Sequence, residues 1–591
     1  MRPGNTSPPN FMQHIPRIKI WYALLLVVMA VFVVKLFYLQ VIRHDYYQQA
    51  ALRGQLKQYE VEAERGTILA HNGDSQTPIV LNQALYTLYT DPKFIKNASE
   101  TALAVQKAIG GDAGEYEEKM KKNSRYEILA KKLSKEQQKT IADLKLKGVG
   151  TQQTNYRTYP QGQLAAQLLG FVNDEGDGQY GLEEALNSEL QGKNGRLKAI
   201  TDAQGVPLAA NKDNIVESPQ SGKQLLLTID LGMQQQLEDI IKQQHDETKA
   251  SQASAVILEA NTGAVKAMAN YPTFNPAEFS TIEDQSAFKN AVVTDAVEVG
   301  SIMKTLTAAA ALDLGVVSKN TSYYDPASFK VDDAVVRNIE EDGGPGTKSI
   351  ADILQLSLNT GATWLLMQMG GGEINQKARV AWHDYLINHY HFGKPTGIEQ
   401  SNEAAGVVPD PNDGYGLNIK FANTAFGQGQ TETILQMAAA LAAVVNGGTY
   451  YQPQLVDAYV RNDGSLEQKK PKIVSENVVK PTVSKDIQEF MAYTLQKNKV
   501  NYGTRELRPE YVYGGKTGTA EVARPEGGYY DDRFDGTFLG FIGGDSPQYV
   551  IAVRIREPRN ISGYAGAKAA APVYFKLVDM LINNFGVKPK S

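Results

Sequence analysis

The longest apolar run in the chain lies close to its N-terminus. Residues 20–42 contain a single charged side chain, Lys35, and aromatic residues occur near both ends of the run. A helix over this run would be about 35 Å long, enough to cross a hydrocarbon core of about 30 Å. The run also exceeds the apolar core of a typical signal peptide, and no small-residue cleavage site follows it. We therefore expect residues 19–42 to form an uncleaved, single-pass membrane anchor.

The charged residues around this run do not decide its orientation. Three basic residues precede the run and three follow it closely: Arg2, Arg17, Lys19, Arg43, Arg53 and Lys57. The excess of Lys and Arg that marks the cytoplasmic side is therefore nearly equal on the two sides. Residues 1–18 contain four prolines, and we expect them to form a short unstructured tail.

Beyond the anchor, the hydrophobic pattern divides the chain into two parts. Residues 43–222 mix short strand-like segments with charged helical ones, and the run over residues 115–122 is typical of a solvated helix face. From residue 223 onward, strand-like runs stand on both sides of a long helical stretch. These runs lie at residues 224–229, 254–258, 511–522, 536–543 and 548–555. This order predicts an α+β domain, in which helices pack on an antiparallel sheet.

One helix inside this second part is expected to begin at Ser301. It follows Gly300, continues through a largely apolar, alanine-rich stretch and stops before Gly315. Lys304 lies three positions after Ser301, so the two side chains share one helix face, with Cβ atoms about 5–6 Å apart. The positive end of the helix dipole would stabilise negative charge on Ser301. Burial would favour the neutral amine of Lys304, which could then act as a base.

This serine and lysine belong to a set of three short motifs. S-x-x-K begins at Ser301, S-x-N begins at Ser357, and K-T-G begins at Lys516. Each motif alone is weak, because S-x-x-K recurs at Ser286 and S-x-N recurs at Ser475, whereas K-T-G occurs once. Together the motifs describe a serine acyl-transfer site that uses a lysine and no histidine.

The surrounding sequence distinguishes the duplicate motifs. Ser286 stands in a polar stretch and Ser475 in an exposed-looking connection, and ordinary turns explain both. Ser357 lies between two apolar helical segments, where a tight turn would project Ser357 and Asn359 into a cleft. Lys516 lies in a strand-like segment with glycines, which often mark the close approach of a ligand.

Composition excludes several classes of function. The 591 residues leave room for three to four domains of about 150 residues each. A net charge of -5 gives no sign of a nucleic-acid-binding surface. The absence of cysteine excludes thiol nucleophiles, disulfides and cysteine-bearing metal sites. The histidines form no ligand pattern beyond His389 and His391, which a helix-ending loop explains better than a metal does. We expect no cofactor and no metal.

The three motifs resemble those of class B penicillin-binding proteins, which are monofunctional peptidoglycan D,D-transpeptidases. The resemblance runs from the anchor to the C-terminus. Further similar segments occupy residues 65–68, 156–160, 169–172, 181–183, 262–268, 271–276, 392–399 and 427–429. The resemblance implies a penicillin-binding transpeptidase fold over residues 223–591. An elongated pedestal domain of the dimerisation type would precede it over residues 43–222.

The resemblance also implies a role for each serine and lysine. Ser301 would attack the D-Ala-D-Ala carbonyl of a stem peptide, release D-alanine and form an acyl-enzyme, which an amine of a neighbouring stem would resolve. Lys304 would be the general base for Ser301, and Ser357 would relay the proton to the leaving group. Asn359 would orient Lys304 and the substrate amide.

The K-T-G strand would bind the substrate. Lys516 and Thr517 would hold the terminal carboxylate of the substrate. Gly518 would let the substrate backbone lie against the strand. The backbone N–H groups of Ser301 and Thr519 would form the oxyanion hole.

The partners follow from the same resemblance. They would be peptidoglycan stem peptides, lipid-linked precursor strands and β-lactams, which would inhibit the enzyme covalently. No glycosyltransferase domain precedes the pedestal, so we expect a membrane glycan polymerase of the shape, elongation, division and sporulation family as partner, with other divisome proteins. Residues 1–18 would lie in the cytoplasm, and the catalytic domain would lie outside the bacterial cell membrane. No nucleic acid is expected.

Several alternatives share the three motifs. The sequence near Thr537 lacks the His-x-Trp-Phe pattern of elongation enzymes, which favours septal synthesis and leaves an elongation role open. A D,D-carboxypeptidase would use the same site. A membrane-bound β-lactamase or antibiotic sensor is disfavoured, because a β-lactamase needs a dedicated deacylating carboxylate and no pedestal. A divisome scaffold without activity is disfavoured because every motif residue is present.

Overall fold

The computed structural model describes residues 17–48, 56–200, 215–339, 344–503, 507–524 and 527–591. The chain forms two compact units. The first unit combines Met1–Ala63 with Lys193–Gln220, and the second combines Glu64–Gly192 with Ser221–Ser591.

The first unit contains the apolar N-terminal helix. Helix α1 (Arg17–Phe37) continues into a π-helical turn over Tyr38–Ile42, and the stretch Ile18–Ile42 is long and apolar enough to cross a membrane. Its apolar side chains are exposed, as a lipid-facing helix requires. The helix expected over residues 20–42 is therefore present, and it is a candidate membrane anchor. The same unit holds an antiparallel sheet of β1 (Leu56–Val61), β8 (Gly195–Ile200) and β9 (Ile215–Glu217).

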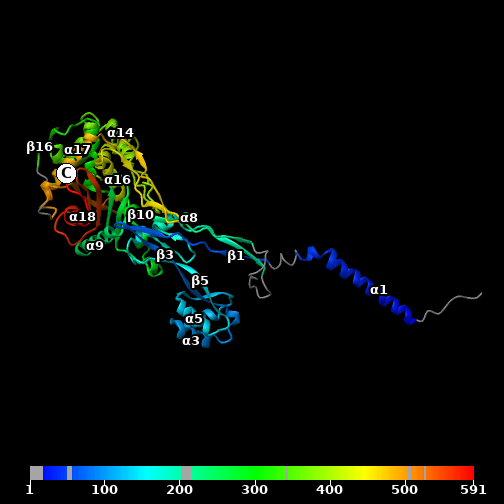
Figure 1. The fold of residues 1–591 in the computed structure, drawn as a ribbon. Helices are drawn as coiled ribbons and strands as arrows, with labels where there is room; N and C mark the ends of the chain where they lie inside the picture. Colours follow the sequence, from blue (N-terminus) through cyan, green and yellow to red (C-terminus); the bar gives the residue numbers. More distant parts are fainter. Residues whose placement is uncertain (1–16, 49–55, 201–214, 340–343, 504–506, 525–526) are drawn as a thin grey trace, which may run out of the picture. The chain divides into compact units, whose positions relative to one another are not determined.

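The second unit is built around a five-stranded antiparallel sheet, which confirms the predicted α+β arrangement (Figure 1). Its strand order is β12-β11-β23-β22-β21. The strands are β11 (Gln252–Glu259), β12 (Val265–Tyr271), β21 (Val512–Ala523), β22 (Tyr529–Gly543) and β23 (Pro547–Arg556). Strand β21, which carries the K-T-G motif, therefore lies at the edge of the sheet.

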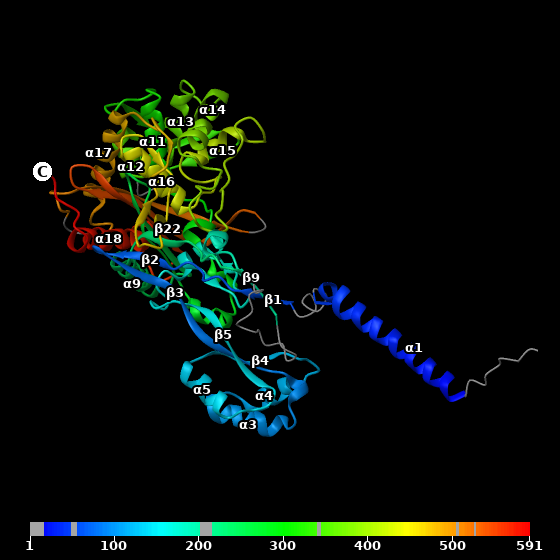
Figure 2. The ribbon, with the colours of Figure 1, turned by 45° about the vertical axis from the view of Figure 1, so that its right-hand side comes forward.

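Helices cover both faces of this sheet, because the central strands are apolar on both faces. Helices α9 (Leu231–Thr248) and α18 (Ala571–Asn584) pack on one face, and α16 (Ile434–Val445) packs on the other (Figure 2). Helix α11 (Met303–Asp313) belongs to the same hydrophobic core as α16.

A second sheet has seven strands, five from before β11 and two, β18 and β19, from between β12 and β21. Its order is β19-β18-β10-β2-β3-β4, and β5 also pairs with β3. The strands are β2 (Ile68–Asn72), β3 (Ser75–Thr90), β4 (Glu127–Leu133), β5 (Val149–Thr158), β10 (Gln224–Asp230), β18 (Val456–Val460) and β19 (Leu466–Gln468). The strand expected at residues 224–229 is therefore present as β10, in this sheet and not in the five-stranded one.

The charged region expected to be helical packs at one end of β3. Helices α3 (Ala98–Ile109), α4 (Ala113–Met120) and α5 (Lys135–Asp143) lie close together there (Figure 2). Their buried apolar side chains form a small core with Leu88 and Leu129. The charged side chains of α4 form exposed i,i+4 ion pairs between Lys119 and Glu115 and between Lys121 and Glu117. A solvated helix face therefore explains this run, as predicted.

Three of the segments that resemble the family, residues 65–68, 156–160 and 181–183, meet in one buried ion network. Glu183, which is fully buried, accepts hydrogen bonds from the guanidinium Nε atoms of Arg65 and Arg157, both at 2.7 Å. Two cations around one carboxylate compensate for the loss of its hydration. The network joins the segment that precedes β2 to β5 and to α7 (Gly181–Ala185).

Candidate active site

Ser301 lies in the first turn of a buried helix. Gly300–Ile302 form a 3-10 turn that leads directly into α11, so the predicted helix is present with a tighter first turn. Every residue from Met303 to Leu312 is buried. The Lys304 Nζ atom lies 2.9 Å from the Ser301 Oγ atom, and the lysine side chain is 0% exposed. The three-residue spacing therefore brings the two groups into direct contact.

The S-x-N motif forms the predicted turn between two helices, α12 (Ile350–Gln355) and α13 (Asn359–Met369). Ser357 has a φ of 60°, which is uncommon for a residue with a side chain. In this conformation both its carbonyl oxygen and its hydroxyl accept hydrogen bonds from Lys304 Nζ, the hydroxyl at 3.2 Å. Asn359 Oδ1 accepts from the same Nζ atom at 2.7 Å. Backbone strain is often concentrated at functional sites.

Strand β21 contributes a second buried lysine. Lys516 is 1% exposed, and its Nζ atom donates to the Ser357 hydroxyl and to the Thr517 carbonyl oxygen, both at 2.9 Å. The Ser357 hydroxyl therefore lies between the Nζ atoms of Lys304 and Lys516. A hydroxyl can donate one proton and accept others, so this position suits proton transfer.

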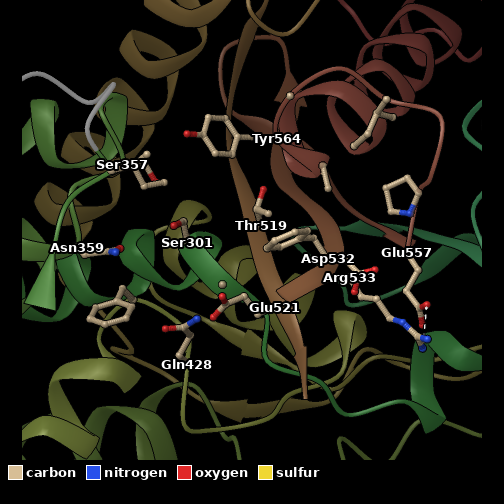
Figure 3. Close-up of a pocket in the computed structure, with 18 of the residues that line it drawn as sticks. Ser301, Ser357, Asn359, Gln428, Thr519, Glu521, Asp532, Arg533, Glu557 and Tyr564 are labelled. Carbon is tan, nitrogen blue, oxygen red and sulfur yellow. Dashed lines mark ion pairs between the residues drawn. The ribbon is translucent and has the colours of Figure 1, made fainter. Parts of the chain in front are cut away.

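A cleft of about 1030 Å³ opens beside these residues. Ser301, Ser357, Asn359 and Thr519 line this cleft (Figure 3). Lys304 and Lys516 do not line it and are buried. Because β21 is an edge strand, one side of its backbone is not paired within the sheet. An extended peptide could pair with such an edge as an additional strand.

A close contact that the sequence did not reveal explains why position 518 is a glycine. A Cβ atom at this position would lie 2.7 Å from the Val299 carbonyl oxygen and 2.3 Å from the Thr537 hydroxyl. Gly518 thus lets the turn that carries Ser301 pack directly against β21. Gly427 allows a second close contact with this turn, since its Cβ would lie 2.0 Å from the Gly300 carbonyl oxygen.

Sequence reasoning missed the opposite wall of the cleft. Its charged and aromatic residues include Glu521, Asp532, Arg533, Glu557 and Tyr564 (Figure 3). Of these, only Glu521 could have been predicted from the sequence, because it lies two positions after Thr519 and therefore on the same face of the strand. The other four come from segments that only the folded chain brings to the cleft.

The duplicate motifs lie away from this cleft. Ser286 is an exposed residue of a 3-10 turn over Gln285–Phe288, and its N–H group donates to Asp284 Oδ1 at 2.9 Å. Ser475 ends β20 (Ile473–Ser475), and its hydroxyl is hydrogen-bonded to His391 Nε2 at 2.8 Å. Neither residue lines the cleft, as the context of each motif predicted.

The two histidines singled out by sequence have protein partners. His389 Nδ1 lies 2.7 Å from the Val478 carbonyl oxygen, and His391 binds the Ser475 hydroxyl. Burial lowers the pKa of His391 to about 4, so its ring is neutral at physiological pH. Within the described ranges, no three His, Asp or Glu side chains are grouped as metal ligands.

Comparison with known proteins identifies the family. The penicillin-binding protein transpeptidase domain matches residues 253–579, more than half of the chain. The penicillin-binding protein dimerisation domain matches residues 60–227. The chain belongs to the penicillin-binding protein transpeptidase family. The resemblance seen in the motifs is thereby confirmed, and so is the expected fold with its N-terminal pedestal region.

Several penicillin-binding proteins and related proteins are similar over most of this chain. Stage V sporulation protein D of Bacillus subtilis is 29% identical, with 90% of this chain and 79% of that protein covered. Peptidoglycan D,D-transpeptidase FtsI of Buchnera aphidicola is 25% identical, with 97% and 96% covered. The crystal structure of penicillin-binding protein 3 of Mycobacterium tuberculosis with aztreonam has a TM-score of 0.67 at 24% identity, with 90% and 98% covered.

Proposed function

We propose that this protein is a serine-type peptidoglycan D,D-transpeptidase that cross-links stem peptides through an acyl-enzyme on Ser301. One observation carries the proposal: Lys304 Nζ contacts the Ser301 hydroxyl at 2.9 Å and is fully buried. A buried amine next to a serine hydroxyl can accept the proton of that serine as it attacks a carbonyl. Family membership supports the same chemistry.

The remaining site residues receive roles that their positions support. Ser357 would pass the proton from Lys304 to the leaving amine, and Asn359 would orient Lys304. Lys516 and Thr517 would bind the carboxylate of D-alanine, whose charge the Lys516 ammonium complements. The N–H groups of Ser301 and Thr519 would stabilise the oxyanion, since both residues line the cleft.

The cellular setting is also a proposal. We place residues 19–42 in the bacterial cell membrane, the pedestal over residues 43–222 and the transpeptidase domain over residues 223–591 outside it. Septal synthesis is favoured by the sequence near Thr537 and by the name FtsI of one relative. A membrane glycan polymerase and other division proteins would be the partners, and β-lactams would acylate Ser301.

A fluorescent penicillin tests the chemistry. We expect covalent, slowly lost label on the wild-type protein and none on Ser301→Ala, whereas Ser286→Ala should label normally. Label that survives on Ser301→Ala would exclude Ser301 as the nucleophile. Incubation with lipid-linked precursor and a partner polymerase then separates the two fates of the acyl-enzyme. A transpeptidase yields cross-linked dimers, whereas a carboxypeptidase yields only trimmed stems.

Depletion of the protein in cells tests the septal role. A septal enzyme is required for division, so we expect its loss to produce filaments. Rounded cells would instead assign the protein to elongation.

A further inference from the structure

Helix α13 begins with Asn359, but its own N-cap residue does not cap it. Leu358 is the N-cap and has no side chain that could accept a hydrogen bond. The first N–H groups of a helix need partners from elsewhere. The N–H group of Thr360 finds one in Asn338 Oδ1, at 3.0 Å, from a segment 22 residues earlier in the chain.

A buried carboxylate lies under the same helix end. Asp325, which is 0% exposed, accepts hydrogen bonds from the Thr360 hydroxyl at 2.8 Å and from Asn338 Nδ2 at 3.0 Å. The backbone N–H group of Ala327 donates to it as well, at 2.8 Å. Negative charge near the start of a helix is favourable because the helix dipole is positive there. Asp325 and Asn338 therefore hold the first turn of α13 from outside the helix.

Arg337, the residue before Asn338, fixes the side-chain amide of Asn359. Asn359 Nδ2 donates to the carbonyl oxygen of Arg337 at 3.1 Å, which leaves Oδ1 directed at Lys304 Nζ at 2.7 Å. Arg337 ends β15 (Ala334–Arg337) and directly precedes Asn338. Two consecutive residues of one segment thus bind two consecutive residues of the helix start.

We propose that Asp325 and Asn338 are positioning residues for acylation, a proposal that rests on the function proposed above. They fix the first turn of α13 and thereby keep Asn359 Oδ1 on Lys304 Nζ. Neither residue lines the cleft, and both act on Lys304 through the start of α13. Their loss should slow the step in which Lys304 takes the serine proton and should leave substrate binding intact.

Substitutions at Thr360 test the network with little change of shape. Thr360→Val removes the hydroxyl that binds Asp325, and Thr360→Ser keeps it. The readouts are the acylation rate constant and the preceding noncovalent dissociation constant for a fluorescent penicillin. We expect acylation to slow about 10- to 100-fold in Thr360→Val, because small displacements of catalytic groups cost rates of this order. The dissociation constant should stay unchanged, and Thr360→Ser should restore the rate.

Two further variants separate positioning from stability. Thr494 is also fully buried, and among the described residues its hydroxyl bonds only to the Phe490 carbonyl oxygen of its own helix. Thr494→Val should therefore lower the melting temperature without slowing acylation. Asn338→Ala removes the cap from a half-buried position and should slow acylation even if Thr360→Val does not fold.

The outcomes also distinguish this proposal from the proposed function. A wild-type protein that takes no label would overturn the function and this proposal with it. A labelled wild type together with unchanged acylation in Thr360→Val or Asn338→Ala would overturn the positioning role alone. The positioning role would also be overturned if weaker noncovalent binding accounted for the whole decrease in labelling. A Thr360→Ser variant that is acylated as slowly as Thr360→Val would overturn it too.

Discussion

The chain contains two S-x-x-K motifs with identical spacing and very different surroundings. Ser286 and Lys289 lie exposed around a four-residue 3-10 turn. Ser301 and Lys304 begin a helix whose residues are buried. Within the described part of the chain, Lys304 Nζ is hydrogen-bonded to oxygen atoms of Ser301, Ser357 and Asn359. Spacing alone therefore brings a serine and a lysine near each other. Acyl-transfer chemistry further requires burial and acceptors that other segments supply.

The largest expected difference between the two motifs concerns their lysines. Lys304→Gln should reduce the rate of acylation by a β-lactam by about 10³-fold, because a positioned general base contributes 10²- to 10⁴-fold. Lys289→Gln should leave the rate unchanged. Stopped-flow or time-resolved labelling measures both rates, and circular dichroism checks that Lys304→Gln folds. Equal rates for the two variants would remove the distinction between the motifs.

A smaller effect is expected from the packing around Ser301. Gly518→Ala places a methyl group against the Val299 carbonyl oxygen and should displace the Ser301 turn. We expect acylation to slow about 10- to 100-fold, since a displacement near 1 Å can cost that much. Gly344→Ala is the control, because its Cβ would meet no atom of the described residues within 4 Å. Wild-type acylation by Gly518→Ala would show that the turn adjusts without cost.

The smallest effect is expected beside Ser286. The hydrogen bond from the Ser286 N–H group lowers the pKa of Asp284, so the folded protein favours its charged form. The stabilisation is therefore present at neutral pH and is lost as the pH falls through the lowered pKa of the folded protein. Asp284→Ala should melt slightly earlier than wild type at pH 7, and the difference should shrink as the pH falls below that pKa. Its labelling should be normal at pH 7, and slower labelling would mean that this turn serves the active site.

The parts of the site that the sequence predicted are those with a local pattern. The helix after Ser301, the turn at Ser357 and the strand at Lys516 each have a periodicity or a motif of their own, and the structure contains all three. Asp325 and Asn338 could not be predicted, because neither residue stands in a motif and both reach Thr360 only through the fold. The edge position of β21 was equally hidden, since strand order depends on long-range pairing.

Some strands that are neighbours in the five-stranded sheet lie far apart along the chain. Strand β11 pairs with β23, so a strand that ends at Glu259 is completed by one that begins at Pro547. β23 also joins β11 to β22, which in turn carries β21 with Lys516. During synthesis, Ser301 and Lys304 therefore leave the ribosome more than 200 residues before the strand that completes their surroundings. We therefore expect the nascent chain to have no acyl-transfer activity before β23 has been made. A protein truncated before β23 should be inactive even though every motif residue is present.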